Sequence, residues 1–281
     1  MTDKYAASLN QLDRYAVVGN PIAHSKSPQI HAEFAKQTNQ DISYEAILAP
    51  LDGFEATVRS LIAQGFKGAN VTVPFKFEAF ELCNELSERA QAAGAVNTLT
   101  FIAGQIHGDN TDGAGLIADI QGNLEHALEG AWILLVGAGG AAQGVLLPLL
   151  NAKPASVIIT NRSLDKAQNM IDNMAAKFAH NKLSASSFEA LSAPFEVIIN
   201  ATSTGLTDTA LPIPNIVFAK NSLAYDMMYG RETPFMAQAR ANGAKVADGL
   251  GMLVEQAAET FQIWRGVRPQ TAPVISQLRK A

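Results

Sequence analysis

The sequence contains a single cysteine among its 281 residues, so no intrachain disulfide can form. Proteins of oxidising compartments often depend on disulfides, and a chain without them is typical of the reducing cytoplasm, where we expect this protein. No apolar run approaches the ~18 residues that a membrane-spanning helix needs, so we expect no contact with a membrane. The segment Met1–Tyr5 has no basic stretch followed by an apolar one, which indicates that no secretory signal is present.

Basic charge is also scarce, because 21 Lys and Arg stand against 26 Asp and Glu, a formal net charge of −5. Dedicated nucleic-acid binders usually carry a basic stripe, so we expect no nucleic-acid partner. The five histidines have no metal-ligand spacing with one another or with Cys83, and we therefore predict no metal site. Charged residues make up 17% of the chain and hydrophobic residues 48%, a balance that excludes a disordered protein.

The chain is long enough for about two domains, and short apolar segments alternate with helical patterns along it. In the first half we predict strands over 15–19, 43–48 and 68–73, a hairpin of 95–101 with 105–108 around Gly104, and a helix over 114–121. In the second half we predict strands over 132–136, 156–160, 195–200, 223–227 and 245–247, and helices ending near 150 and over 165–178, 234–242, 252–264 and 272–278. Continuous apolar strands that alternate with helices are typical of an open parallel α/β sheet.

Two helix starts carry local signals in the sequence. Ser27 before Pro28 predicts that a helix begins there with Ser27 as its N-cap. The segment Asp52–Glu55 resembles a capping box before a second helix.

A glycine-rich segment, Gly137–Ala142 (GAGGAA), connects the predicted strand 132–136 to a helix. Glycines at such a turn let the backbone approach a pyrophosphate, which the N–H groups of the helix N-terminus then bind. The alternative is a tight βα turn with a structural role alone. The residues that the first interpretation places against a dinucleotide are Gly137, Ala138, Gly139, Gly140 and Ala141.

The end of the next strand favours NADP(H) as the cofactor. NAD enzymes usually place Asp or Glu there to bind the ribose 2′-hydroxyl, whereas this strand ends in Thr160 followed by Asn161–Ser163. Arg162 can bind a 2′-phosphate through its planar fork, and Lys166 adds a point charge. Asp165 falls within the following helix. The alternative is that Arg162 and Lys166 are ordinary surface charges.

Polar residues in the first half follow predicted strands, where ligands of open α/β sheets bind. They are Ser25, Ser27, Thr72, Lys76, Asn97 and Asp112. Lys76 and Asp112 are the only pair among them that is suited to proton transfer. Taken singly, each has a structural explanation, because Ser27 caps a helix, Asp112 precedes a turn glycine and Lys76 could be a solvated lysine.

Six segments stand in the order Asn20–Pro28 (NPIAHSKSP), Asn70–Lys76 (NVTVPFK), Gly94–Thr98 (GAVNT), Asn110–Gly113 (NTDG), Gly137–Ala141 (GAGGA) and Asp248–Met252 (DGLGM). This ordered set resembles the shikimate dehydrogenase family over nearly the whole chain. The resemblance implies NADPH-dependent reduction of 3-dehydroshikimate to shikimate in aromatic amino-acid biosynthesis, by a monomer or homodimer. It also implies a two-domain α/β fold. Residues 1–112 and 249–281 would form the substrate-binding domain, and residues 113–248 would form the Rossmann-type NADP-binding domain.

The resemblance also implies roles for individual residues. Ser25 and Ser27 would bind the substrate carboxylate, and the contacts to its ring oxygens or neighbouring groups would come from Thr72, Asn97, Asp112, Tyr229 and Gln256. Lys76 and Asp112 match the catalytic pair. The matches to the adenosine-phosphate loop are Asn161, Arg162, Ser163 and Lys166. Thr202, Met227 and Gly249 match positions near the nicotinamide, and Glu88 is a further match on the cofactor side.

We expect Lys76 to stabilise the developing alkoxide and Asp112 to orient the substrate oxygens, and either could deliver the proton. One departure from the family is visible in the turn Gly230–Pro234, which lacks the proline that often follows the Asp-x-x-Tyr motif ending at Tyr229. Two alternative functions remain, a quinate/shikimate dehydrogenase that uses NAD and a non-catalytic NADP-sensing module.

Overall fold

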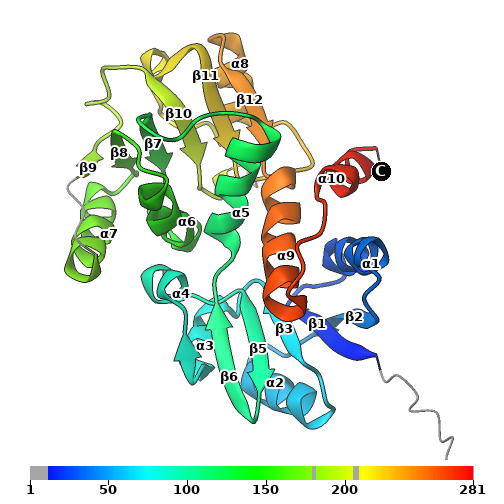
Figure 1. The fold of residues 1–281 in the computed structure, drawn as a ribbon. Coiled ribbons are helices and arrows are strands. Elements are labelled where there is room, and N and C mark those ends of the chain that lie inside the picture. Colours follow the sequence, from blue (N-terminus) through cyan, green and yellow to red (C-terminus); the bar gives the residue numbers. More distant parts are fainter. Residues whose placement is uncertain (1–11, 179–181, 205–208, 281) are drawn as a thin grey trace, which may run out of the picture.

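The computed structural model describes residues 12–178, 182–204 and 209–280. Met1–Tyr5, on which the expectation about a secretory signal rests, lies outside the described residues. Two β-sheets stand one above the other in Figure 1, with helices α5 and α9 running between them. None of the helices in the described ranges is long and apolar enough to cross a membrane.

The first sheet is mixed and has the strand order β2-β1-β3-β5-β6-β4. Its strands are β1 (Asp13–Gly19), β2 (Ile42–Leu48), β3 (Gly68–Val71), β4 (Glu85–Leu86), β5 (Thr98–Ile102) and β6 (Gln105–Asp109). β1 pairs in parallel with β2 and β3, whereas β5 is antiparallel to β3 and β6. The predicted hairpin is confirmed, and Gly104 takes a left-handed φ of +80° at its turn.

The second sheet is parallel throughout and has the order β12-β11-β10-β7-β8-β9. Its strands are β7 (Trp132–Val136), β8 (Ser156–Thr160), β9 (Leu183–Ser186), β10 (Phe195–Asn200), β11 (Phe218–Asp226) and β12 (Lys245–Asp248). Counted from β7, this is the doubly wound order 3-2-1-4-5-6 of dinucleotide-binding folds. The predicted two-domain α/β class with a Rossmann-type part is confirmed. β9 was not predicted, because its sequence LSAS holds one large apolar residue.

The helices are α1 (Ser27–Thr38), α2 (Phe54–Ala63), α3 (Lys76–Leu82), α4 (Glu88–Ala93), α5 (Asp112–Ala118), α6 (Gly140–Asn151), α7 (Leu164–Lys177), α8 (Pro234–Ala241), α9 (Leu250–Arg265) and α10 (Ala272–Leu278). A π-helical turn over Asp119–Asn123 continues α5. α5 packs closely against α9, since a Cβ at Gly115 would lie 2.8 Å from the carbonyl oxygen of Met252.

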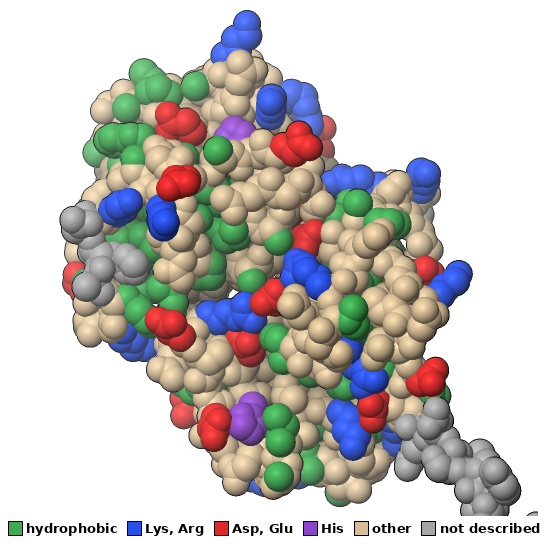
Figure 2. Space-filling view, viewed as in Figure 1, with side chains coloured by type: hydrophobic (Ala, Val, Ile, Leu, Met, Phe, Trp, Pro, Cys, Tyr) green, Lys and Arg blue, Asp and Glu red, His purple; other side chains and the backbone are tan. Residues whose placement is uncertain are grey.

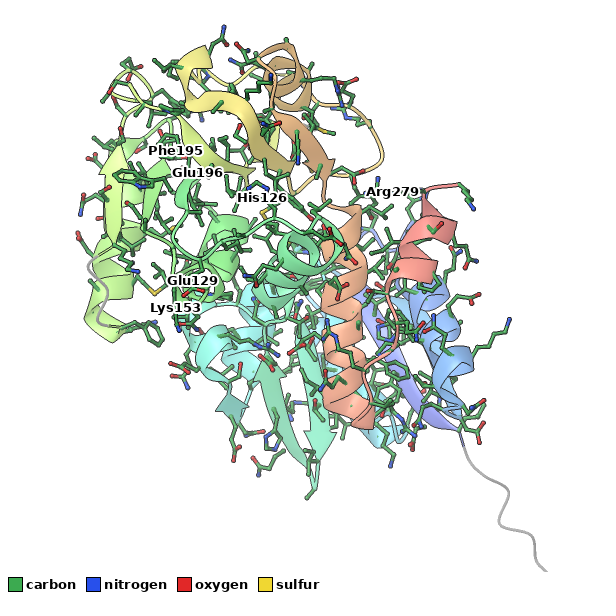
Figure 3. The ribbon with its side chains drawn as sticks, turned by 45° about the horizontal axis from the view of Figure 1, so that its top comes forward. His126, Glu129, Lys153, Phe195, Glu196 and Arg279 are labelled. Atoms are coloured by element: carbon green, nitrogen blue, oxygen red, sulfur yellow. The ribbon has the colours of Figure 1, made fainter. Side chains whose placement is uncertain are left out.

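The C-terminal helices contact both halves of the molecule. Phe261 of α9 packs edge-on against Phe34 of α1, with ring centroids 5.8 Å apart. Arg279, labelled in Figure 3 just after the last residue of α10, forms a 3.0 Å ion pair with Asp248 at the end of β12.

Three predicted helix starts are wrong in detail. Ser27 is the first residue of α1 and not its cap, because Lys26 already has helical dihedral angles. The side chain of Asp52 does not cap α2, which follows Gly53 without a side-chain cap. Asp112 opens α5 two residues earlier than predicted. Residue type alone does not determine the backbone dihedrals that distinguish a cap from a first helical residue.

Candidate active site

A cavity of about 350 Å³ lies at the carboxyl ends of β1 and β3, closed on other sides by α5, α9 and the segment after β11. The residues that the resemblance assigned to the substrate all line it: Ser25, Ser27, Thr72, Lys76, Asn97, Asp112, Tyr229 and Gln256. Further lining residues include Asn70 and His24. The structure therefore brings together side chains that are spread along the sequence from Ser25 to Gln256.

Lys76 and Asp112 form an ion pair in this cavity, with Nζ 2.6 Å from Oδ2. Lys76 begins α3 and Asp112 begins α5, so each side chain is positioned by the first turn of a helix. Their side chains are 30% and 19% exposed, which leaves them accessible to a ligand while most of their surface is covered. The other carboxylate oxygen of Asp112 accepts a 2.8 Å hydrogen bond from Nδ2 of Asn97.

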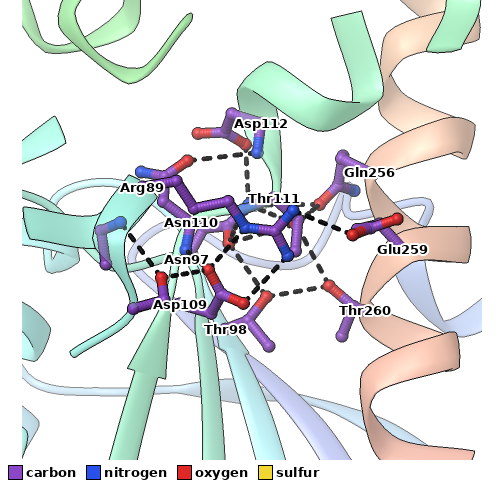
Figure 4. Close-up of polar contacts among 12 residues, drawn as sticks. Arg89, Asn97, Thr98, Asp109, Asn110, Thr111, Asp112, Gln256, Glu259 and Thr260 are labelled. Atoms are coloured by element: carbon purple, nitrogen blue, oxygen red, sulfur yellow. Dashed lines mark hydrogen bonds and ion pairs between the residues drawn. The ribbon is translucent and has the colours of Figure 1, made fainter. Parts of the chain in front are cut away.

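Asn97 is held in turn by hydrogen bonds around its buried carboxamide (Figure 4). Its Oδ1 accepts from the backbone N–H of Thr111 at 2.9 Å, and its Nδ2 also donates to Oγ1 of Thr111 at 2.9 Å. A longer contact of 3.4 Å links Nδ2 to Oε1 of Gln256 on α9. The amide orientation and hence the hydrogen bond to Asp112 are set by these partners.

A second layer of hydrogen-bonded side chains, around Asn70, supports this network and was not predicted from the sequence. Asn70 accepts a 2.7 Å hydrogen bond from Tyr44, and its Nδ2 donates to Thr98 and Thr260, both at 3.2 Å. Asn70 is a polar residue inside a buried strand, a signal that could have indicated it. Thr260 lies on α9, 162 positions from Thr98, and its sequence neighbourhood gives no such signal.

A buried aromatic cluster lies next to Asn70, a residue that lines the cavity. His31 stacks on Tyr44 with ring centroids 4.1 Å apart, and neither of its ring nitrogens has a hydrogen-bond partner among the residues that the structure describes. Burial lowers the pKa of His31 to about 3, although the neighbouring Asn70 amide opposes this shift. Burial likewise raises the pKa of Tyr44 well above its usual value, despite a hydrogen bond to Ser27.

An ion-pair network fixes the strand end just before Asp112 (Figure 4). Arg89 binds both carboxylate oxygens of Asp109, at 2.7 and 2.9 Å, and donates to Glu259 on α9 at 2.9 Å. Burial by itself raises the pKa of Asp109, but the contacts to Arg89 outweigh it and hold that pKa below its usual value. The network ties the end of β6 to α9. Elsewhere, the face in Figure 2 carries basic and acidic side chains interspersed.

The glycine turn joins β7 to α6. Gly137 has a φ of +113°, and a Cβ there would lie 3.1 Å from Cγ2 of Thr202. Gly139 precedes α6 without any side-chain cap, and a Cβ added to it would meet nothing within 4 Å. Gly139, Gly140 and Ala141 are exposed, whereas Ala138 is half-buried. Open space in front of uncapped N–H groups fits a pyrophosphate.

The predicted adenosine-phosphate loop lies beside this turn, because β8 pairs in parallel with β7 and aligns Thr160 with Val136. Nδ2 of Asn161 donates to the carbonyl oxygen of Ser163 at 3.0 Å. Arg162 and Lys166 are exposed, and within the described part of the chain neither forms an ion pair. These two cations fit a phosphate on the ribose.

Family models match this chain along most of its length. The "Shikimate dehydrogenase substrate binding domain" matches residues 17–99, "Shikimate / quinate 5-dehydrogenase" matches 119–208, and "Shikimate 5'-dehydrogenase C-terminal domain" matches 249–279. A shikimate dehydrogenase (NADP(+)) from Methylobacillus flagellatus is 59% identical over 272 residues, which are 96% of this chain and 100% of that protein. The chain belongs to the shikimate dehydrogenase family. The family and its NADP-dependent oxidoreductase class were therefore predicted correctly.

Solved structures agree with this membership. The Ael1 enzyme from Pseudomonas putida has a TM-score of 0.91 at 49% identity, covering 95% of this chain and 98% of that one. Shikimate 5-dehydrogenase from Thermus thermophilus, in complex with NADP(H) and shikimate, has a TM-score of 0.85 at 32% identity, covering 96% and 99%.

Two of the three predicted nicotinamide-side residues of this family member line the cavity, and the third, Thr202, lies beside Gly137 of the glycine turn. Met227 and Gly249 line the cavity, and a Cβ at Gly249 would lie 2.3 Å from the carbonyl oxygen of Met227, so only glycine fits there. Thr202 donates to Oδ1 of Asn200 at 2.7 Å. The turn without the family proline is ordered by Asp226, which accepts a 2.6 Å hydrogen bond from Thr233.

Glu88 is the predicted residue that the structure does not bring to this site. It lines a separate cavity together with Leu147 and Asn151, which lie at the C-terminal end of α6. The glycine turn lies at the opposite end of that helix. Glu88 opens α4, whose packing against α6 carries its N-terminus away from the turn. In the ranges that the structure describes, no three His, Cys, Asp or Glu side chains are grouped so that they could hold a metal ion.

Proposed function

We propose that this protein catalyses the reversible, NADPH-dependent reduction of 3-dehydroshikimate to shikimate. The observation that carries the proposal is the Lys76–Asp112 ion pair, which lies in a cavity of about 350 Å³ that Met227 and Gly249 also line. A non-catalytic sensor has no need of an accessible ammonium–carboxylate pair at this position. The protein would serve the formation of chorismate and the aromatic amino acids.

Substrate binding is assigned to the cavity walls. Ser25 and Ser27 lie at the start of α1 and would bind the substrate carboxylate through their hydroxyl groups. On the opposite walls, Thr72, Asn97, Tyr229 and Gln256 would contact the ring hydroxyl groups and their neighbours. Hydrogen bonds from several elements would orient the ring, and an oriented substrate loses less entropy on reaching the transition state.

When bound, NADPH supplies the hydride for the ketone carbon of the substrate. Lys76 places a positive charge where the carbonyl oxygen gains negative charge, which lowers the barrier by electrostatic stabilisation. Asp112 keeps that ammonium in place through the 2.6 Å contact, and Asn97 holds the carboxylate from its other side. One proton from Lys76 or Asp112 completes the hydroxyl group, and both remain candidates for this donor.

Cofactor selection is assigned to the loop after β8. Arg162 would form a bidentate contact to the 2′-phosphate of NADP(H), and Lys166 in the first turn of α7 would add charge. Asn161 and Ser163 complete this loop, and the segment 137–141 would bind the pyrophosphate. The strand end carries no carboxylate to bind the 2′-hydroxyl group of NAD(H).

The deciding experiment is an assay of NADP⁺ reduction with shikimate, run beside quinate and NAD⁺ in all four combinations. We expect shikimate with NADP⁺ to give the highest kcat/KM. Higher activity with quinate and NAD⁺ would support a quinate/shikimate dehydrogenase instead. Binding of NADP⁺ without turnover of either substrate would support a sensor.

We further propose that residues 1–112 and 249–281 form the substrate-binding domain and residues 113–248 the cofactor domain. The chain would then cross between domains at the start of α5 and before α9, and closure would occur about these crossings. X-ray scattering with and without both ligands tests closure, which an unchanged radius of gyration contradicts. We place the protein in the cytoplasm, as a monomer or homodimer without nucleic-acid or membrane partners.

A further inference from the structure

Phe77, the residue after Lys76, has an unusual position for a large apolar side chain. The residue is 59% exposed, and its ring lies across from the glycine turn. A Cβ added to Gly140 would lie 3.4 Å from Cζ of Phe77, so the ring rests against the first turn of α6. No role for Phe77 was predicted from the sequence.

The first turn of α3 therefore faces two sites at once. Successive helix residues point about 100° apart, so Lys76 reaches Asp112 while Phe77 reaches Gly140. The space over Gly139, immediately beside that contact, is open. Phe77 therefore adjoins this open space through Gly140 and is the chain neighbour of Lys76.

We propose that Phe77 is a cofactor-contact residue whose ring packs against the nicotinamide riboside half of bound NADPH. The proposal rests on the proposed function, because hydride transfer requires the nicotinamide to lie near Lys76. Contact between an exposed apolar ring and water is unfavourable, and a ligand that covers the ring removes this apolar surface from solvent. The contact positions the reactive half of the dinucleotide, while Arg162 binds the adenosine half.

The test separates the two halves of the cofactor. Dissociation constants are measured for NADPH, by its fluorescence, and for adenosine 2′,5′-bisphosphate, by competition. Phe77→Ala should weaken NADPH about tenfold, equivalent to roughly 1.4 kcal/mol, and leave the bisphosphate within about twofold of the wild type. Phe77→Leu, which keeps an apolar side chain, should recover most of the NADPH affinity.

Ile102→Ala is the matched control, because Ile102 is 52% exposed at the β5–β6 hairpin, away from the cavity. Wild-type NADPH affinity in Phe77→Ala, or tighter binding, overturns the assignment. An equal loss for NADPH and the bisphosphate also overturns it, because the ring would then act on the whole cofactor domain. If wild-type protein turns over shikimate while Phe77→Ala binds NADPH normally, only this inference fails. If wild-type protein binds no NADPH, both this inference and the proposed function fail.

Discussion

The substrate side and the cofactor side of the site are built in opposite ways. On the substrate side Asn97, Thr111 and Asn70 are at most 7% exposed, and their polar groups already have partners within the protein. On the cofactor side Gly139 and Arg162 are exposed, and the N-terminus of α6 has no side-chain cap.

This difference follows from burial. A buried polar group must be hydrogen-bonded, so the fold itself fixes the orientation of the substrate-side groups before any ligand arrives. An exposed backbone N–H or guanidinium is satisfied by water and can exchange that water for phosphate oxygens. We therefore expect substitutions on the substrate side to change the reaction rate, and substitutions on the cofactor side to change affinity.

The largest effect is expected for Lys76→Ala. Loss of the ammonium should lower kcat about 10³-fold with a much smaller change in the KM for shikimate, because the charge acts mainly on the transition state. Steady-state kinetics in the oxidation direction measure both constants. Lys36→Ala, at the exposed end of α1, is the control. A near-normal kcat in this variant would show that Lys76 takes no part in the reaction. It would also contradict the expectation that substrate-side substitutions change the reaction rate.

Arg162→Ala should act on the cofactor side alone. We expect NADPH to bind roughly 10- to 100-fold more weakly, since hydrogen bonds to a charged group contribute about 1.5–3 kcal/mol. The affinity for NADH and the kcat with saturating NADPH should change little. Fluorescence titrations with both cofactors test this, with Arg59→Ala, an exposed arginine on α2, as a control. Equal losses for NADPH and NADH would contradict the 2′-phosphate assignment.

His31→Phe tests whether the buried imidazole of His31 excludes a proton in the folded protein. In the unfolded chain His31 takes up a proton near its usual pKa of 6.5, whereas in the folded protein its pKa is about 3. The wild type therefore loses stability as the pH falls below about 6.5, and by pH 5 the loss through His31 reaches about 2 kcal/mol. Urea unfolding of both proteins at pH 7 and pH 5 should show this loss only in the wild type. Parallel pH profiles would mean that the folded protein admits the proton.

Thr260→Val should give the smallest effect. The hydroxyl group contacts Thr98 at 2.8 Å and Asn70 at 3.2 Å, and its removal leaves buried partners unsatisfied at a cost of about 1 kcal/mol. We expect kcat to fall about fivefold because the Asn97 layer above loosens. Thr260→Ser, which keeps the hydroxyl group, should restore the rate. Loss of stability with an unchanged kcat would show that this layer only supports the fold.

Much of the second sheet was predictable because its strands are continuous apolar runs, such as Trp132–Val136 and Ser156–Thr160. The glycine turn and the absence of an acid after Thr160 were equally local signals. Short elements escaped prediction, including α4 with six residues and β4 with two, because they span too few residues for a periodic pattern. Glu88 was assigned to the cofactor by family position, and only the packing of α4 against α6 showed where it lies.

The sequence by itself determined most of the strand and helix pattern, the glycine turn and, through six ordered segments, the family. It determined these because burial periodicity and turn chemistry are encoded within a few neighbouring residues. Only the tertiary structure decided that Thr260 bonds to Thr98 and Thr111 beside Asn97 and that Phe77 faces Gly140. The contacts of α9 depend on how closely it approaches α5 and the turn after it, which the missing side chains at Gly115 and Gly251 allow, and the contact of Phe77 depends on how α3 packs beside α6.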